Sequence, residues 1–381
     1  MRTAPVSVLG SVSFGWLHDE GGFVVDEPFF MEPLVRRERE AAMHAFVARR
    51  FPRDPVYNIE AHLVQVEGRR CPVILVGGIQ PNLILGAAVG ARFVFYGDKD
   101  PDMTQSPLKD ITSLEPLWKI NWASTWPISL FLEQIERLRR EEAVSAAHAE
   151  GGNADRSASG GAQPPVIIPP YFWDTTGRAT THGIVTTAQK LMGERVFLEM
   201  VDNPSFVHEF LDWIVDAYVK QIHLFAAAAG LPVTGLHTGD CSVCMIGPRQ
   251  FEEFVLPHLN DFARRVGPLR LHSCGTSDHL LDTFQHVAGL ASLNVGSNTR
   301  VAAIRERFGP MRIDLIPDTQ LLTSGKPADV EAWVRRSVEE NGDGRLEFQY
   351  HLDAGQPQET CLQINRTLES LGINTPRTEV F

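Results

Sequence analysis

The feature that most constrains the fold is a regular alternation of strand and helix patterns in the carboxyl-terminal part of the chain. Five short runs typical of buried strands occur there, and an amphipathic helical pattern follows each of them. The runs are VTGLHTGD, LRLHSC, LASLNVG, MRIDLIPD and RLEFQYHLD. Consecutive strand–helix units of this kind are typical of a parallel sheet that is covered by helices.

Three further strand candidates precede this region and bring eight strands within reach. They are VIIPP, and nearer the amino terminus PVILVG and RFVFYG. Eight strands that alternate with helices predict an α/β fold, and we expect a (β/α)8 TIM barrel with an N-terminal extension. An open doubly wound sheet is the alternative, but no GxGxxG motif follows the first strand to favour it.

We interpret residues 1–70 as the N-terminal extension and residues 71–381 as the barrel. A segment at about 144–165 is rich in Ala, Gly and Ser and therefore predicts a flexible loop. The helical pattern at 248–267 contains Pro257. Because proline lacks a backbone N–H, we expect a kink in that helix.

Charge and hydropathy exclude several classes of partner. The chain has 35 Lys and Arg residues against 47 Asp and Glu, a net charge of −12. We expect no nucleic-acid partner, because binding to a phosphate backbone requires a basic surface. No stretch approaches 18 apolar residues, so no membrane span is expected either. The amino terminus has one arginine and no long apolar run, so it is not interpreted as a signal peptide.

The cysteine content indicates the compartment. Five cysteines among 381 residues are an odd and low number, which argues against a disulfide framework. We therefore expect the protein in the reducing cytoplasm. A homodimer is an open expectation, because the sequence does not fix the oligomeric state.

Polar and metal-binding residue types recur where the predicted strands end. In a parallel barrel, the active site lies at the carboxyl-terminal ends of the strands, so side chains from different strands converge there. The residues in these positions are Asp240, His272, Cys274, Asn294, Asp318 and His351.

The pair His272 and Cys274 is the strongest signal for a metal. Residues i and i+2 of a strand face the same side, and imidazole and thiolate are good zinc ligands. Two ligands do not complete a site, so a third must come from another strand. His351, Cys361, Cys241, Cys244 and Asp240 are the candidates, although Cys361 falls inside the last predicted helix and is expected to point to the core. The alternative is that an isolated His-x-Cys or Cys-x-x-Cys pattern binds no metal and has only a structural role.

Several segments of the sequence resemble a known protein family. The segments IGPRQFEEFVLPHLNDF, LRLHSCG, PDTQLLTSGKPADVEAWVRRSV and QYHLDAGQP resemble the uroporphyrinogen decarboxylase superfamily, as does LILGAAVGARFVFYGD nearer the amino terminus. Within it, the H-x-C-G pattern is similar to the branch of coenzyme M methyltransferases. The resemblance covers most of residues 70–372.

The resemblance implies a (β/α)8 barrel with a catalytic zinc ion. In that branch a thiol such as coenzyme M binds the zinc and attacks an alkyl group on a corrinoid or another electrophile. His272 and Cys274 match the family's ligands, and the third ligand, usually a cysteine after the last strand, is replaced here by His351. The chain lacks a D-x-H-x-x-G corrinoid-binding segment. A corrinoid would therefore come on a separate protein or as the free cofactor.

Three functions stay open at this stage. The first is a zinc-dependent methyl- or alkyltransferase with His272, Cys274 and His351 as ligands. Asp240 would then be a further ligand or a substrate contact, and Asn294 or Asp318 would orient the site. The second is a metal-free lyase or decarboxylase that acts on a small acid, with Asp240 and His351 transferring protons. The third is a binding barrel without catalysis.

The substrate is expected to be a small molecule. Uroporphyrinogen itself is not expected, because the arginine-rich motif that would bind its acidic side chains is absent from the amino-terminal part. The sequence does not name the alkyl donor or the acceptor. It also leaves the roles of Cys241, Cys244 and Cys361 open, although Cys361 falls inside the last predicted helix.

Overall fold

The computed structural model describes residues 6–58, 63–66, 69–150, 165–173 and 176–375. Its strands are β1 (Val6–Val12), β2 (Val56–Asn58), β3 (Leu63–Val66), β4 (Arg69–Leu75), β5 (Phe93–Val94), β6 (Asp102–Met103), β7 (Val166–Ile168), β8 (Arg178–His182), β9 (Gly235–Gly239), β10 (Leu269–Ser273), β11 (Leu290–Gly296), β12 (Arg312–Ile316) and β13 (Leu346–Leu352).

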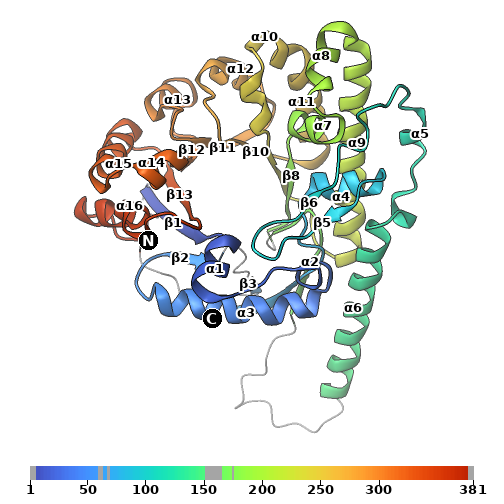
Figure 1. The fold of residues 1–381 in the computed structure, drawn as a ribbon, viewed down its shortest axis with the longest axis horizontal. Helices are drawn as coiled ribbons and strands as arrows, with labels where there is room; N and C mark the ends of the chain where they lie inside the picture. The colour runs from blue at the N-terminus through green and yellow to red at the C-terminus, as the bar shows by residue number, and fades with distance from the viewer. Residues whose placement is uncertain (1–5, 59–62, 67–68, 151–164, 174–175, 376–381) are drawn as a thin grey trace.

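Eight of these strands form one curled sheet. Their order is β2-β1-β13-β12-β11-β10-β9-β8, and every pairing within it is parallel. Helices lie around the outside of the curl (Figure 1). The predicted α/β class and parallel sheet are therefore confirmed. Closure of the barrel stays a prediction, because the pairings among the described residues leave β2 and β8 as the ends of this sheet.

The amino-terminal strand β1 lies inside the sheet. All seven of its residues pair with β13, from Val6 opposite Leu346 to Val12 opposite Leu352. On its other side β1 pairs with β2. Assigning residues 1–70 to an extension outside the barrel is therefore corrected for β1 and β2. The reason is that VSVLGSV alternates buried with more exposed side chains, which suits one face on the core and one on the lumen.

A smaller sheet holds two of the other predicted strands. β4, from PVILVG, pairs in parallel with β7, from VIIPP, and antiparallel with β3. The remaining candidate, RFVFYG, was wrong as a barrel strand. Only Phe93 and Val94 of it form a strand, which pairs antiparallel with β6 away from the main sheet.

The helices follow the predicted pattern in the carboxyl-terminal half and include several short ones before it. They are α1 (Phe14–Gly21), α2 (Glu27–Met31), α3 (Pro33–Arg50), α4 (Pro81–Ala88), α5 (Glu115–Trp118), α6 (Ile128–Glu150), α7 (Ile184–Met192), α8 (Arg195–Asp202), α9 (Pro204–Ala229), α10 (Pro248–Gln250), α11 (Leu256–Val266), α12 (Leu281–Phe284), α13 (Val301–Phe308), α14 (Thr319–Ser324), α15 (Pro327–Asn341) and α16 (Gln358–Ser370).

Two predicted local features can be compared with the structure. Ahead of Pro257 the helix passes through a π-helical turn, Phe251–Val255, before α11 begins, and the kink expected at Pro257 stays a prediction. Of the predicted loop at 144–165, residues 144–150 belong to α6. Residues 151–164 lie outside the described part of the chain.

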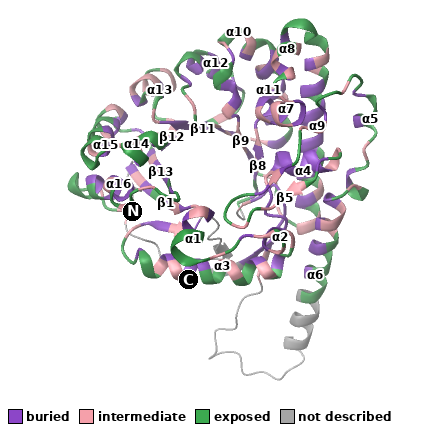
Figure 2. Ribbon diagram, viewed as in Figure 1, coloured by how far each residue is buried: buried purple, intermediate pink, exposed green. Residues whose placement is uncertain are grey.

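The strands separate an apolar layer from a polar lumen. On β10, Leu269, Leu271 and Ser273 are buried toward the helices, while Arg270 and His272 are half-buried on the concave side. Figure 2 shows buried segments along the strands and along the inner sides of the surrounding helices. On the concave side of β1, Leu9 is 42% exposed, so the lumen is open to solvent there. Side chains that line the lumen are therefore accessible to a ligand.

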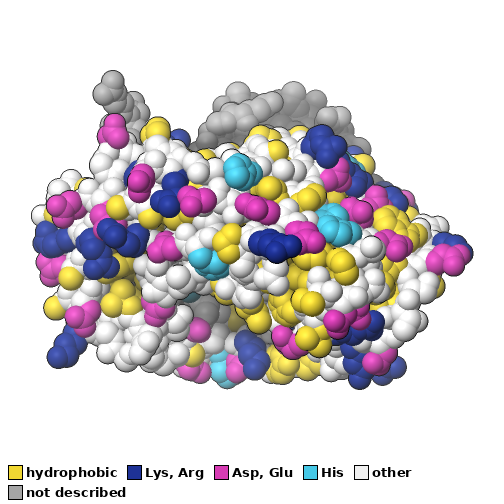
Figure 3. Space-filling model, turned by 90° about the horizontal axis from the view of Figure 1, so that it is seen from above, with side chains coloured by type: hydrophobic (Ala, Val, Ile, Leu, Met, Phe, Trp, Pro, Cys, Tyr) yellow, Lys and Arg dark blue, Asp and Glu magenta, His cyan; other side chains and the backbone are white. Residues whose placement is uncertain are grey.

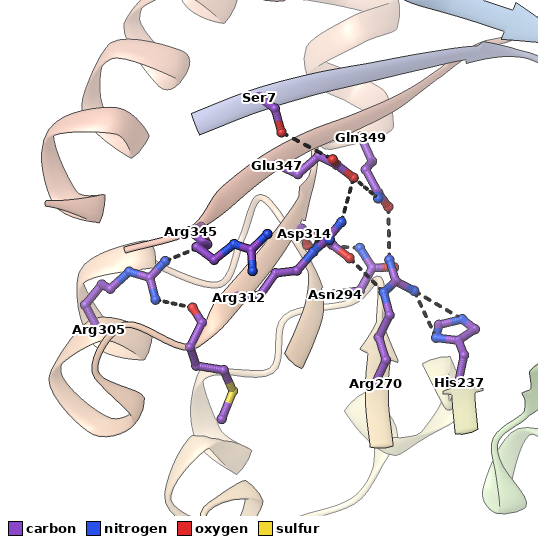
Figure 4. Close-up of polar contacts among 11 residues, drawn as sticks. Ser7, His237, Arg270, Asn294, Arg305, Arg312, Asp314, Arg345, Glu347 and Gln349 are labelled. Carbon is purple, nitrogen blue, oxygen red and sulfur yellow. Dashed lines mark hydrogen bonds and ion pairs between the residues drawn. The ribbon is translucent and has the colours of Figure 1, made fainter. Parts of the chain in front are cut away.

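A network of charged side chains crosses this lumen (Figure 4). Arg270 donates from Nε to Asp314 at 2.7 Å and from a terminal nitrogen to Gln349 at 3.1 Å. Arg312 bridges Asp314 and Glu347, at 2.8 and 3.0 Å. Because β10 and β13 are separated by two strands in the sheet, the contact from Arg270 to Gln349 requires the sheet to curl. The network therefore ties together the strands beneath the mouth of the lumen.

The outer surface is mixed in charge. On the face drawn in Figure 3, Lys and Arg side chains are interspersed with Asp and Glu and with scattered apolar groups. That face therefore presents no continuous basic surface of the kind that nucleic-acid backbones require. Among the described residues, no helix combines the length and apolar character needed to cross a bilayer.

Candidate metal centre

Two neighbouring strands bring three ligand side chains together at the mouth of the lumen. β9 and β10 pair in parallel, with His272 opposite Gly239. Cys241 follows β9 by two residues, at the start of a short 3-10 helix, Cys241–Met245. Cys274 directly follows β10. Because parallel strands end at the same edge of a sheet, residues 31 and 33 positions apart in sequence meet there.

The three side chains form a compact donor set. Cys241 Sγ lies 3.3 Å from His272 Nε2 and 2.9 Å from Cys274 Sγ, and the three ligand atoms lie within 4.8 Å of one another. A tetrahedral zinc ion holds its ligand atoms roughly 3.4–3.8 Å apart. The sulfurs lie closer together than two zinc ligands would, so they must separate by several tenths of an ångström when a metal binds, and thiol protons are released at that step. Two thiols and an imidazole therefore fit zinc and leave one position open, as in catalytic sites.

The second nitrogen of His272 is held by an amide. Nδ1 lies 2.7 Å from Asn294 Oδ1, and Asn294 in turn donates from Nδ2 to the carbonyl of Asp314 at 2.9 Å. Since the amide nitrogen is committed to that carbonyl, Oδ1 must accept from Nδ1–H. The lone pair of His272 is then on Nε2, which faces Cys241. This is the arrangement by which metal-binding histidines are usually oriented.

The contacts also favour one thiolate in the group. The hydrogen bond with Cys241 and, after it, the contact with His272 lower the pKa of Cys274 to about 4. The hydrogen bond with Cys274, followed by burial, raises the pKa of Cys241. Of the two thiols, Cys274 is therefore the more acidic one. A thiolate is the form of cysteine that binds a metal.

Asp240 is buried beside this group, and both of its carboxylate oxygens accept hydrogen bonds. Its carboxylate accepts hydrogen bonds from the backbone N–H of Val185 at 3.1 Å and of Thr186 at 2.9 Å, and from the Thr186 hydroxyl at 2.8 Å. It is 3% exposed, and burial raises the pKa of its carboxyl group. The carboxylate thus holds the first turn of α7 and fixes the backbone from which Cys241 projects. A catalytic role for Asp240 stays a prediction.

His351 lies on β13, outside the set of three ligand atoms among the described residues. Its Nδ1 is 2.5 Å from the hydroxyl of Ser11 on β1. His351 is therefore not part of this group, and its role as a metal ligand stays a prediction. Both histidines still face the lumen, since residues 272 and 351 occupy its concave side on β10 and β13.

Asp318 caps a helix at a separate pocket. Its Oδ1 accepts from the backbone N–H of Gln320 at 2.7 Å, and Oδ2 accepts from the side chain of Asn298 at 3.2 Å. It lines an open pocket of about 630 Å³ that also contains Asp329 and Arg336. The structure therefore gives Asp318 a helix-capping contact, and its predicted role as an orienting group is untested.

Two further cysteines are placed by the structure. Cys244 is exposed, and its thiol donates to the carbonyl of Cys241 at 3.0 Å. It is not part of the three-atom group formed by the described residues. Cys361 is fully buried in α16, as its position in an amphipathic helix predicts.

Sequence reasoning chose His351 as the third ligand and missed His182 altogether. Cys241 was only one of the further candidates, and the turn of the chain after β9 is what brings it to His272 and Cys274. His182 ends β8 and faces the lumen, but the sequence RATTH has no apolar run that would signal a strand. A Gly directly after His182 and a helical pattern beyond it were the available signals.

Comparisons with known proteins agree with this architecture. Residues 178–363 match the family described as uroporphyrinogen decarboxylase (URO-D). Among solved structures, a methyltransferase from Methanosarcina mazei superposes with a TM-score of 0.62. The alignment covers 98% of this chain and 95% of that one at 15% sequence identity, which is a likeness of fold. No curated protein sequence matches the chain.

Proposed function

From the match of residues 178–363 to the uroporphyrinogen decarboxylase family model, we propose that this protein is a zinc-dependent methyl- or alkyltransferase of that superfamily. It moves a methyl or alkyl group from a corrinoid or another electrophilic donor to a thiol. The observation that carries the proposal is the group Cys241, His272 and Cys274, whose ligand atoms lie within 4.8 Å of one another at the mouth of the lumen. The likeness of fold to a methyltransferase supports it.

The chemistry requires an acceptor sulfur that is ionised at neutral pH. A free thiol has a pKa of about 8.5, so only a few per cent of it is nucleophilic. When bound, zinc supplies a positive charge that keeps the acceptor deprotonated at the open position. In the transfer, the acceptor sulfur forms a bond to the alkyl carbon while the bond from that carbon to the donor breaks. The donor leaves with the electron pair.

Different residues of the chain are proposed to bind the metal, to orient its ligands and to contact the donor. Cys241, His272 and Cys274 are the proposed ligands. Asn294 keeps the His272 lone pair on Nε2 through its 2.7 Å contact with Nδ1. Asp240 fixes the backbone next to Cys241 through its contacts with α7. His351 and Ser11 lie on β13 and β1, where they can contact the donor or complete the coordination.

The lumen is proposed to be the inside of a closed barrel. β4 and β7 fall between β2 and β8 in chain order, so they are the strands that would close it. The helix α3 packs against both β2 and β4, and an isolated bridge joins Phe172, just after β7, to Ala179 on β8. These contacts support closure of the barrel by β4 and β7.

The alternative of a metal-free lyase has weaker support. It requires Asp240 to exchange a proton with a substrate, but both carboxylate oxygens already accept hydrogen bonds from α7. It also gives no role to the convergence of two thiols and an imidazole. A corrinoid, if one takes part, is proposed to come on a separate protein or as the free cofactor.

Metal analysis tests the proposal directly. We expect about one zinc per chain in the purified protein, and loss of that zinc in Cys274→Ala. Cys244→Ala is the matched control, because Cys244 belongs to the same cluster of loops but not to the three-ligand group. Zinc-loaded protein should also demethylate free methylcobalamin in the presence of a small thiol, followed by its absorbance. A protein that binds no zinc, or that retains it fully in Cys274→Ala, contradicts the proposal.

A further inference from the structure

Thr186 links both chain neighbours of the proposed ligand Cys241 to the first turn of α7. Its hydroxyl donates to the Asp240 carboxylate at 2.8 Å, and the backbone N–H of Ser242 donates to the same hydroxyl at 3.0 Å. Asp240 directly precedes Cys241 in the chain, and Ser242 directly follows it. A hydroxyl has one proton and two lone pairs, so it makes both contacts at once. One side chain therefore holds the backbone on either side of the ligand.

The element that carries Cys241 is too short to fix it alone. Cys241 begins a 3-10 helix of five residues, Cys241–Met245, and the carboxylate of its N-cap Asp240 accepts from α7 and makes no capping contact. A 3-10 helix also has poorer hydrogen-bond geometry than an α-helix. His272 and Cys274, by contrast, lie on or directly after β10, which pairs with a strand on each side. Of the three proposed ligands, Cys241 therefore depends most on contacts from outside its own element.

The helix that supplies these contacts is itself well anchored. Most of the first two turns of α7 is buried, including Ile184, Val185, Thr187 and Ala188. The helix also lies close to the loop, because a Cβ added to its N-cap Gly183 would be 2.0 Å from Cβ of Asp240. One turn beyond Thr186, the side chain of Gln189 accepts from the Ser242 hydroxyl at 2.6 Å. α7 therefore provides a fixed support for the loop that carries Cys241.

We infer that Thr186 is the positioning residue for the third metal ligand, and that its hydroxyl sets where the sulfur of Cys241 lies relative to His272 and Cys274. This inference rests on the proposed function, since it takes these three side chains to bind zinc. Thr186 acts through the backbone and is not itself a ligand. Without the hydroxyl, the loop after β9 must become ordered when the metal binds, and the entropy lost in that step opposes binding.

Removal of the hydroxyl tests the inference without any turnover. Co²⁺ in place of zinc reports binding through its sulfur-to-cobalt absorbance band, so titration of the metal-free protein gives the dissociation constant. We expect Thr186→Val, which keeps the size of the side chain, to weaken cobalt binding about 10- to 100-fold, the usual effect of losing a group that orients a ligand. Thr186→Ser should bind cobalt as the wild type does, because it retains the hydroxyl. If Thr186→Val does not fold, the smaller Thr186→Ala takes its place in the same titration.

Thr187→Val is the matched control for disturbance of α7. Thr187 is the next residue of the helix, and its hydroxyl lies 2.7 Å from the hydroxyl of Tyr218 in the core. Both variants lose a hydroxyl hydrogen bond on the same helix, so urea denaturation without metal should show that both are destabilised. Only Thr186→Val should lose cobalt affinity. An equal loss of affinity in Thr187→Val would show a general disturbance of the helix and overturn the inference.

A double-mutant cycle with Cys241→Ala shows whether Thr186 acts through Cys241. Cys241→Ala retains two ligands and should bind cobalt more weakly, and the addition of Thr186→Val should then cause no further loss of affinity. A further loss of the same size as in the wild-type background overturns the inference alone, as does unchanged affinity in Thr186→Val. Unchanged affinity in Cys241→Ala, or a wild type that shows no sulfur-to-cobalt band, overturns the proposed function and the inference with it.

Discussion

Asn294 and His272 are linked by a 2.7 Å hydrogen bond that fixes which nitrogen of the imidazole is free for a metal. Without the amide, the ring can rotate or change tautomer, so Asn294→Ala should weaken zinc affinity about 10- to 100-fold, as removal of such partners typically does. Competition with a chromogenic chelator measures this. Asn298→Ala is the control, because the exposed side chain of Asn298 donates to Asp318 and not to His272. Equal affinity in wild type and Asn294→Ala would refute the orienting role.

Gly183 should tolerate no side chain, because a Cβ there would lie 2.0 Å from Cβ of Asp240. Gly183→Ala is expected to lower the free energy of unfolding by about 1–3 kcal/mol through overpacking. Gly247 is the matched control, since it also precedes a helix with extended backbone, and its added Cβ meets nothing closer than 3.7 Å. Urea denaturation of both variants compares them. Equal destabilisation would show that the contact with Asp240 is not the cause.

Asp314 should be essential to the stability of the lumen network. It is 1% exposed and accepts from both Arg270 and Arg312. In Asp314→Ala two guanidinium groups lose their shared carboxylate, and breaking a buried pair in this way costs about 3–5 kcal/mol. Urea denaturation gives the value. The control is Asp282→Ala, which removes an exposed partner of Arg307 and should change stability little.

Acid should destabilise the metal-free protein through its buried histidines. Burial is the main cause that lowers the pKa of His182 to about 4 and lowers the pKa of His258 as well. In the unfolded chain a histidine has a pKa of about 6.5. Between pH 6.5 and 4 the unfolded state therefore binds protons that the folded state does not, so stability falls as the pH falls.

The His182→Asn variant isolates this effect from the carboxylates. Asp240, whose pKa is raised by burial, contributes to the pH dependence with the opposite sign. The wild type should lose stability more steeply than the variant, by at most about 1.4 kcal/mol per pH unit, the value for one proton. Urea denaturation at pH 7.5, 6.0 and 5.0 measures both slopes. Parallel curves for the two proteins would contradict the assignment.

The sequence predicted those strands that can be recognised from their own local pattern of apolar residues. β10, β12 and β13 contain apolar side chains at alternate positions, which face the helices. β1 and β8 were missed, and for β8 the reason is that polar residues occupy its lumen side. In β8 these are Arg178, Thr180 and His182, which leave no apolar run. A strand that lines a polar lumen looks like a loop when it is read alone.

The site was predictable only in part, for a related reason. His272 and Cys274 are two residues apart, so the geometry of a strand alone places them together. The choice between Cys241 and His351 depends on how the chain turns after β9 and how far the sheet curls, and neither is a local property. The same holds for Arg270, whose partners Asp314 and Gln349 lie 44 and 79 residues away.

Because β1 lies between β13 and β2, the main sheet can be completed only after β13 has been made. Ser7 and Glu347 form a hydrogen bond across 340 residues of sequence. Since contacts between distant parts of a chain form slowly, β1 must wait for β13 before this sheet is complete. Until then β1 and β12 each present an unpaired edge, which is the surface on which newly made chains associate with one another. Truncation after β12 should therefore yield an aggregating polypeptide and not a smaller folded protein.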